Sequence, residues 1–167
     1  MKKRLFSIVL SLCMVLALMP QMVFADTISG TTEDGFSYTI SDAGEVTITG
    51  YTGSGGAVEI PSTIDNTPVK SIGQNAFMGC KSLTSIVISG SVTSIGDTAF
   101  DNCTSLKNIN IPNGVTTITY AAFENCTNLS SITISDSVTL IEAYAFRNCT
   151  SLASVTIPDG VTHIGSY

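Results

Sequence analysis

The chain has 167 residues, of which 44% are hydrophobic and 12% are charged, with 7 Lys+Arg against 13 Asp+Glu. This composition is too apolar for a disordered chain, and the net charge of −6 argues against a nucleic-acid-binding protein, because few cations are present to neutralise phosphates. The length predicts one domain, and one histidine and no tryptophan leave little material for acid–base or metal chemistry.

Residues 1–25 have the organisation of a secretory signal peptide. Three basic residues precede an uncharged apolar run over residues 5–19, and small residues stand at the −3 and −1 positions of a cleavage site after Ala25. A transmembrane helix is the alternative, but the run is shorter than the roughly 20 residues that a span needs. A lipoprotein anchor at Cys13 is a weaker alternative, because the large Leu12 precedes it where a small residue is preferred.

Removal of the signal peptide leaves residues 26–167, with four basic (7 − 3) against thirteen acidic side chains and a net charge of −9. We therefore expect an exported, acidic protein that is secreted or held at the cell surface. Neither nucleic acid nor an anionic membrane surface is expected as a partner, and no membrane span is expected after signal removal.

Residues 26–57 contain two runs of alternating polarity, 36–40 and 45–51, joined by Asp42-Ala43-Gly44. They predict a β-hairpin that caps the N-terminal end of the fold. Residues 58–71 resemble the opening of a repeat, with five additional residues in its turn.

Residues 72–163 consist of four repeats of equal length, each twenty-three positions long, and eight apolar positions recur at that spacing. Within a repeat, the pattern Leu83-x-x-Ile86-x-Ile88 predicts a strand with both isoleucines inward. A turn and a short second extended segment follow, and the Ala-Phe-x-x-Cys segment has spacing typical of one helical or 3₁₀ turn. No single repeat can bury its own apolar side, so the repeats predict a solenoid. Residues 164–167 begin a fifth repeat without its Ala-Phe, which suggests a fragment, a truncated gene or the N-terminal module of a longer protein.

These repeats resemble the BspA-like class of leucine-rich repeats, in the Leu83-x-x-Ile86-x-Ile88 core and in the recurring Ala-Phe-x-x-Cys-x-x-Leu. The resemblance implies a leucine-rich-repeat solenoid, a right-handed α/β superhelix dominated by β-structure with short helical or 3₁₀ turns. It also implies a secreted or surface protein that mediates adhesion or other contacts with extracellular or host proteins. One departure is that the Asn or Cys expected after the strand is replaced by Ser or Gly, and the cysteines precede the strand instead.

The cysteine column allows three interpretations. Two disulfides are possible in an exported chain, but side chains stacked at the ~4.8 Å strand spacing point in parallel rather than toward one another. Four sulfurs in a line are also not tetrahedral, as zinc requires. We interpret the column as a buried ladder of thiols that act as small hydrophobic groups. Its members are Cys80, Cys103, Cys126 and Cys149.

Two polar columns also follow the repeat. Asn102, Asn125 and Asn148 each begin a formal N-x-T glycosylation signal, and we expect them instead to bond the backbone at a turn. The threonine column could bind ice or a carbohydrate lattice, but a structural hydroxyl ladder is the better expectation. Its members are Thr93, Thr116, Thr139 and Thr162.

No catalytic set, cofactor-binding site or metal site is expected, and the protein is predicted not to be an enzyme. His163 is the only imidazole and lies at a variable surface position. The carboxylates that could act in pairs fall on small turns, where we expect them to be solvated; they are Asp97, Asp101, Glu124 and Glu142.

The outward positions of the long strands remain as a candidate binding face for an extracellular or host protein, or a glycan. The strand side of a horseshoe solenoid is its extended binding surface. The alternative for these residues is that they only favour β-structure and solubility. The second hypothesis for the whole protein is a structural spacer or the N-terminal module of a larger surface protein or enzyme. The candidate residues are Ser85, Val87, Asn108, Asn110, Ser131, Thr133, Ser154 and Thr156.

Overall fold

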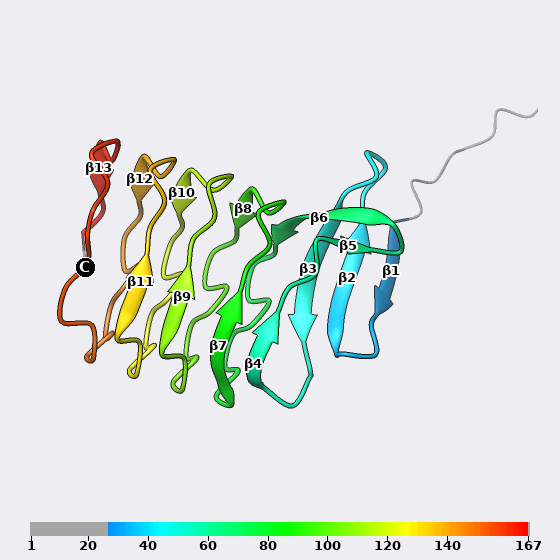
Figure 1. Cartoon of the computed structure of the whole chain (residues 1–167), viewed down its shortest axis with the longest axis horizontal. Helices are drawn as coiled ribbons and strands as arrows, with labels where there is room; N and C mark the ends of the chain where they lie inside the picture. The colour runs from blue at the N-terminus through cyan, green and yellow to red at the C-terminus, as the bar shows by residue number, and fades with distance from the viewer. Residues whose placement is uncertain (1–26, 167) are drawn as a thin grey trace, which may run out of the picture.

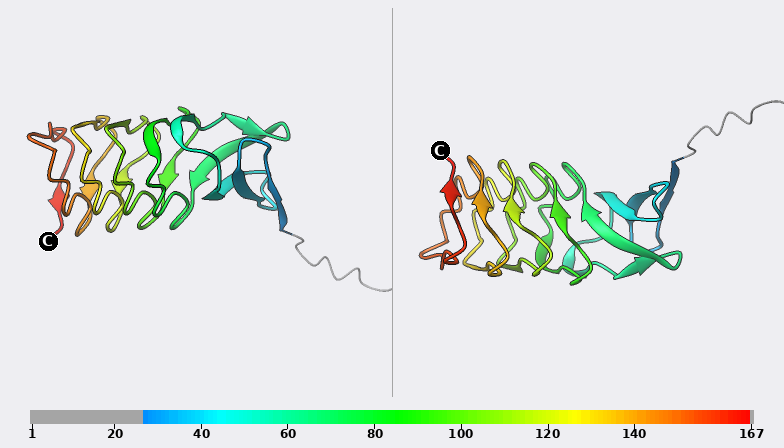
Figure 2. Two further views of the ribbon diagram at one scale, coloured as in Figure 1. Left: turned by 90° about the horizontal axis from the view of Figure 1, so that it is seen from below. Right: turned by 90° about the horizontal axis from the view of Figure 1, so that it is seen from above.

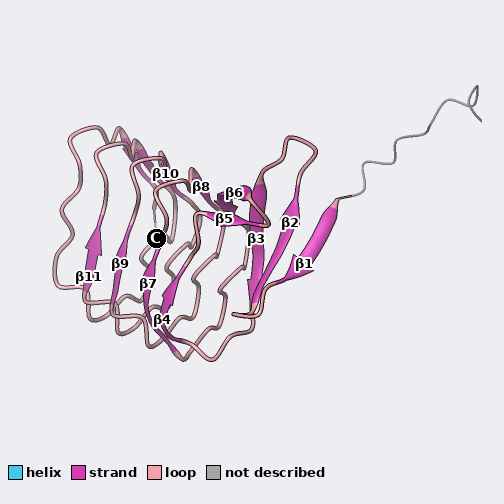
Figure 3. Ribbon diagram, turned by 45° about the vertical axis from the view of Figure 1, so that its right-hand side comes forward, coloured by secondary structure: helices cyan, strands magenta, loops and turns pink. Residues whose placement is uncertain are grey.

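The structure is a computed structural model that describes residues 27–166. The predicted signal peptide therefore lies outside the described residues. Residues 27–166 form thirteen β-strands joined by turns and contain no helix. Figure 3 shows these strands and loops coloured by type. In this part of the chain, accordingly, there is no helix long and apolar enough to cross a membrane.

The N-terminal end is formed by three antiparallel strands of a six-stranded sheet, β1 (Ile28–Thr31), β2 (Phe36–Ile40) and β3 (Val46–Tyr51). Strands β2 and β3 form the predicted hairpin, and each buries alternate apolar side chains. Strand β1 was not predicted, because its side chains are mostly exposed and its sequence does not alternate. Figure 1 shows these three strands at the end of the stack of coils.

Two sets of parallel strands, a long-strand ladder and a short-strand set, build the solenoid, and the last coil contributes only a short strand (Figures 1 and 2). The long-strand ladder contains β4 (Gly56–Glu59), β7 (Leu83–Val87), β9 (Asn108–Asn110) and β11 (Ser131–Thr133). The short strands are β8 (Ser94–Ile95), β10 (Thr117–Ile118), β12 (Leu140–Ile141) and β13 (His163–Ile164). Equivalent positions of neighbouring coils are separated by the predicted 23 residues, as in the hydrogen bond from Ser94 Oγ to Ser71 Oγ.

The junction between the N-terminal sheet and the coils is made by β6 (Thr67–Ile72), which pairs in parallel with both β3 and β8. Strand β5 (Thr63–Ile64) pairs antiparallel with β6, so the additional residues of the first turn form a hairpin. Its two turn residues, Asp65 and Asn66, have φ of 51° and 60°, as a type I′ turn requires. The Tyr38 hydroxyl donates to Asp65 Oδ2 at 2.5 Å and ties the hairpin to the N-terminal sheet.

Turns with hydrogen bonds to the carbonyl three residues back, as in a 3₁₀ turn, occupy the Ala-Phe-x-x-Cys segment, so of the two predicted forms the α-helical one is not observed. Successive N–H groups alternate between a carbonyl three residues back and a carbonyl in the next coil. Cys103 N–H, for example, bonds to Phe100 O at 3.2 Å, whereas Phe100 N–H bonds to Ala122 O at 2.9 Å. Half of the amides that a helix would use internally therefore connect neighbouring coils.

Stacked phenylalanines run through the centre of the solenoid. The ring centroids of Phe77, Phe100, Phe123 and Phe146 are 5.1, 5.4 and 5.7 Å apart in order, and the rings are nearly parallel. The first three rings are fully buried. Burial declines at the C-terminal end, where Phe146 is half-buried and Ile157 is 39% exposed.

Candidate binding face

Six of the eight predicted face residues lie on neighbouring long strands. Strand pairing aligns Ser85 with Asn108 and Asn108 with Ser131, and it places Asn110 beside Thr133. The intervening isoleucines, such as Ile109, point into the core. Most of these outward side chains are exposed, and Val87 is 59% exposed at the end of β7.

Ser154 and Thr156 do not extend this ladder, which corrects the prediction for the last coil. Both side chains are exposed, but residues 152–157 form no strand, and β11 pairs only with β9. The half-buried Leu152 and Val155 show that the last coil is packed less tightly than the coils before it. Fewer core contacts are available there to offset the entropy of ordering a strand.

Two further face residues were missed, Ala57 and Glu59 on β4. Strand pairing places them beside Ser85 and Val87, and both are exposed. The alternation of Val58-Glu59-Ile60 gave the signal, but the irregular turn that follows obscured the register.

The resulting face is a regular array of hydroxyls and amides with one large apolar side chain, Val87, and one carboxylate, Glu59. It can exchange hydrogen bonds with a flat partner, since these side chains are ordered by the strands beneath them. Over residues 27–166, no three His, Cys, Asp or Glu side chains gather in a way that could hold a metal ion.

The cysteine column is a ladder of free thiols, as predicted, with an additional hydrogen-bonding role. The thiols of Cys103, Cys126 and Cys149 are buried and donate to the phenylalanine carbonyl of the preceding coil, each at 3.1 Å. Cys80, at the first full repeat, is half-buried. Each of the three buried thiols thus fills space and also gives a second hydrogen bond to a carbonyl that already accepts a backbone N–H, which a methyl group could not do.

Burial disfavours the thiolate and raises the pKa of every thiol in the column. The pKa of Cys103 rises from 9.0 to about 12, with the neighbouring Cys80 adding to the effect, and that of Cys149 rises to about 11. The pKa values of Cys80 and Cys126 are also raised, chiefly by burial. Because the thiolate is the nucleophile, these cysteines are unreactive at neutral pH.

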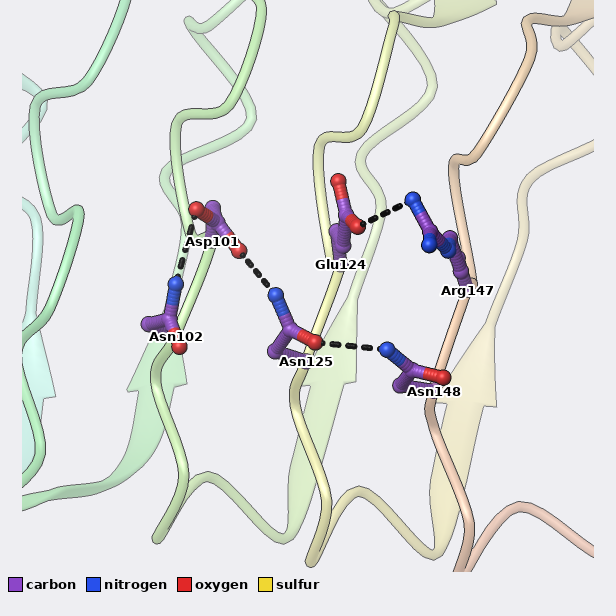
Figure 4. A network of polar contacts seen from close by, with 6 residues as sticks. All are labelled: Asp101, Asn102, Glu124, Asn125, Arg147 and Asn148. Carbon is purple, nitrogen blue, oxygen red and sulfur yellow. Dashed lines mark hydrogen bonds and ion pairs between the residues drawn. The ribbon is translucent and has the colours of Figure 1, made fainter. Parts of the chain in front are cut away.

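The asparagine column bonds to side chains rather than to the backbone, which corrects the prediction (Figure 4). Asp101 accepts from Asn102 Nδ2 at 2.9 Å through one oxygen and from Asn125 Nδ2 at 3.0 Å through the other. Asn148 Nδ2 continues the row by donating to Asn125 Oδ1 at 2.8 Å. All three asparagines have φ near 60°, a conformation that asparagine tolerates better than most residues.

Asp101 was expected to be solvated, yet it is only 8% exposed and is the one buried charged residue in the part of the chain that the structure describes. Glu124, in the next coil, forms an ion pair with Arg147 at 3.2 Å, and its side chain is 18% exposed. These two carboxylates therefore hold neighbouring coils together instead of facing solvent. Asp97 is exposed, as predicted.

Substitution Asp101→Ala is expected to lower the free energy of unfolding by about 1–3 kcal/mol, because two amide donors lose their acceptor. Denaturant unfolding measures this loss, and Asp97→Ala is the matched control. That exposed substitution should change stability by less than about 0.5 kcal/mol. Equal effects of the two substitutions would contradict a structural role for Asp101.

The threonine column is a hydroxyl ladder along the backbone. Thr93 donates to Lys70 O at 3.3 Å, Thr139 to Thr116 O at 3.4 Å and Thr162 to Thr139 O at 3.2 Å. These hydroxyls are engaged within the solenoid, which favours the structural interpretation over a lattice-binding one.

Three solved bacterial structures are similar to this chain. A leucine-rich-repeat protein of T. pallidum is 39% identical, with a TM-score of 0.77, over 81% of this chain. A leucine-rich cell surface protein of Faecalibacterium prausnitzii is 38% identical (TM-score 0.73, 83% of this chain), and a leucine-rich-repeat protein of Bacteroides ovatus is 36% identical (TM-score 0.74, 80%). The chain spans 64%, 38% and 37% of those three chains, respectively. No curated protein matches it.

The family described as the BspA type leucine-rich repeat region matches residues 59–167 in six copies. This range contains most of both strand ladders and the phenylalanine, cysteine and asparagine columns. The repeat spacing, the observed coils and the structural similarity agree with that match. The chain therefore belongs to the BspA-type leucine-rich-repeat family.

Proposed function

We propose that this protein is an exported binding module that attaches to an extracellular or host protein through its long-strand face. The observation that carries the proposal is the open surface of β4, β7, β9 and β11, whose outward side chains are regularly spaced and mostly exposed. Export is supported by the signal-peptide pattern of residues 1–25, and surface location by the similarity to a leucine-rich cell surface protein. The role requires neither catalysis nor a cofactor.

The mechanism of attachment follows from the strands beneath the face. Because each outward side chain is fixed by a strand, little conformational entropy is lost when a partner binds. Asn108 and Asn110 lie in the central part of the ladder, and the exposed Val87 supplies the apolar contact nearby. Adhesion would then result from many modest contacts along the ladder. The right-handed coiling implied by the family resemblance stays a prediction.

Substitution Asn110→Arg tests the face, because a long charged side chain would separate a flat partner from the strands. The purified protein is assayed for binding to immobilised extracellular matrix proteins and to epithelial and bacterial cells. We expect about tenfold weaker binding by Asn110→Arg and unchanged binding by Thr116→Arg, an exposed control position off the long strands. Equal binding of both variants, or no binding by the unaltered protein, would contradict the proposal.

A structural spacer, or the N-terminal module of a larger surface protein or enzyme, is the second candidate. It is favoured by the observation that this chain spans only 37–38% of two of the similar proteins. Intact mass after separation of medium, wall and membrane fractions tests this role. A wall-held species much larger than residues 26–167 supports the spacer, and a free species with the mass of residues 26–167 in the medium contradicts it.

A further inference from the structure

A group of side chains on and beside the short strands departs from the repeat in three neighbouring coils. Tyr120 occupies a column that holds Asp97 in the preceding coil and Ala143 in the following one. Glu142 stands in a column where three other coils have glycine, namely Gly73, Gly96 and Gly165. Leu140 and His163 share a column with Ser94 and Thr117. The repeat architecture therefore does not require these four larger side chains, which we call the Tyr120 patch (Tyr120, Leu140, Glu142 and His163).

The Tyr120 patch surrounds an open hollow of about 500 Å³, with Ala143 also lining it. A hollow of this size is in the range of small-ligand sites. Tyr120 is 44% exposed and is one of six large apolar side chains that are exposed in the described residues. The small Ala143, in the column of Tyr120, leaves the space beside the tyrosine open.

The patch is held in place from two sides. Glu142 Oε2 accepts the Tyr120 N–H at 2.9 Å, which fixes the carboxylate beside the tyrosine. The Tyr144 ring packs edge-on against Tyr120, with centroids 5.5 Å apart, and the Arg147 guanidinium lies 5.1 Å from the Tyr144 centroid. Arg147 is in turn ion-paired with Glu124, as Figure 4 shows.

Tyr144 adopts this position with φ of 61°, a conformation that is unfavourable for a bulky side chain. The left-handed backbone belongs to the repeat, because Asn75, Thr98 and Ala121 occupy the same column with φ of 60°, 54° and 52°. The turn of each coil therefore sets this backbone conformation, and Tyr144 is the bulkiest of the four side chains that the column places on it. In this position the Tyr144 ring packs against the exposed Tyr120 ring and holds it in place.

An exposed aromatic ring beside leucine, a fixed carboxylate and an imidazole matches a ligand that has apolar C–H faces and many hydroxyl groups. Glu142, with Asp97 and Glu124 in the adjoining coils, disfavours an anionic ligand. Seven residues line the hollow, far fewer than the roughly 20–30 that each partner contributes to a stable protein–protein interface. We propose that the Tyr120 patch binds a neutral glycan, with one sugar ring stacked on Tyr120 and a sugar hydroxyl donating to Glu142. This site is separate from the long-strand face.

The purified protein is titrated with cellotetraose, maltotetraose and chitotetraose as neutral probes and with an oligogalacturonate as the anionic probe. Tyrosine fluorescence and calorimetry report binding. We expect at least one neutral probe to bind, with affinity about tenfold weaker in Tyr120→Ala and nearly retained in Tyr120→Phe, which keeps the ring. Asp97→Ala, in the same column one coil away, is the matched control and should leave affinity unchanged, as should Asn110→Arg on the long-strand face.

Three results would overturn the proposal. The first is that no neutral probe binds at millimolar concentration, and the second is that Tyr120→Ala and Asp97→Ala have the same affinity. The third is that only the oligogalacturonate binds, or that a protein rather than a glycan is retained through Tyr120. Circular dichroism of each variant establishes that the solenoid is folded, so that lost binding is not lost structure.

Discussion

Replacing Phe123 with alanine is expected to lower the free energy of unfolding by about 3–5 kcal/mol. Phe123 is fully buried, and its ring stacks between Phe100 at 5.4 Å and Phe146 at 5.7 Å. The neighbouring rings are held at the coil spacing by backbone hydrogen bonds on both sides, for instance Phe123 N–H to Ala145 O at 2.9 Å. They cannot move together to fill the space, so a cavity remains. Chemical denaturation of the variant measures the loss.

The matched control is Phe146→Ala, at the end of the same column. Phe146 is half-buried and stacks on one neighbour only, so its removal should cost about 1–2 kcal/mol. A smaller loss for Phe123→Ala than for Phe146→Ala would contradict the view that the central ring is enclosed. In a solenoid, each coil contacts only its neighbours, so an effect of this size would be local to the coils around Phe123.

The solenoid could be predicted from the sequence because one physical requirement is repeated. Ile86, Ile109 and Ile132 recur at the repeat spacing, each between outward neighbours that are mostly polar, and a strand is the simple way to bury one side of that pattern. The cysteine column was predicted for the same reason, since a small apolar side chain recurs just before the strand. The alternation also indicated the hairpin of β2 and β3.

The turn geometry could not be predicted from spacing alone. The Ala-Phe-x-x-Cys pattern is compatible with one helical turn, but the alternating bonds of Phe100 and Cys103 depend on where the next coil's carbonyls lie. The burial of Asp101 is also a property of two coils, because its second oxygen is satisfied by Asn125, 24 residues away. Local sequence carries no signal for such a partner.

The candidate binding face was predicted in its central part and not at its ends. Ser85, Asn108, Asn110, Ser131 and Thr133 follow directly from strand alternation. Glu59 was missed because the hairpin in the first turn breaks the regular repeat spacing, whereas Ser154 and Thr156 were placed on a strand that the last coil does not form. Both differences arise where a coil has an irregular neighbour.

Stability should fall steeply as the pH rises from 9 to 10, because the buried thiols keep their protons longer in the folded chain than in the unfolded one. An exposed thiol has its ordinary pKa of 9.0, whereas burial raises that of Cys103 to about 12, that of Cys149 to about 11 and that of Cys126 strongly. Below pH 9 both states are protonated, and the thiols give no pH dependence. Above pH 9 the unfolded chain binds fewer protons, so the free energy of unfolding decreases until the folded thiols also ionise.

Each thiol contributes at most about 1.4 kcal/mol per pH unit, and three together up to about 4 kcal/mol per pH unit. Denaturant unfolding in steps between pH 9 and pH 10 measures the slope of the unfolding free energy against pH. This window lies below the ordinary tyrosine pKa of 10.0, and the hydrogen bond from Tyr38 to Asp65 raises the pKa of Tyr38 above that value. Substitution Cys126→Ala should reduce the slope by about a quarter to a third, since Cys80 also has a raised pKa, whatever the cost of the substitution in stability at neutral pH. An unchanged slope would mean that the Cys126 thiol has the same pKa in the folded and unfolded chains. That result would contradict the burial of Cys126 and its hydrogen bond to Phe100 O as causes of a raised pKa.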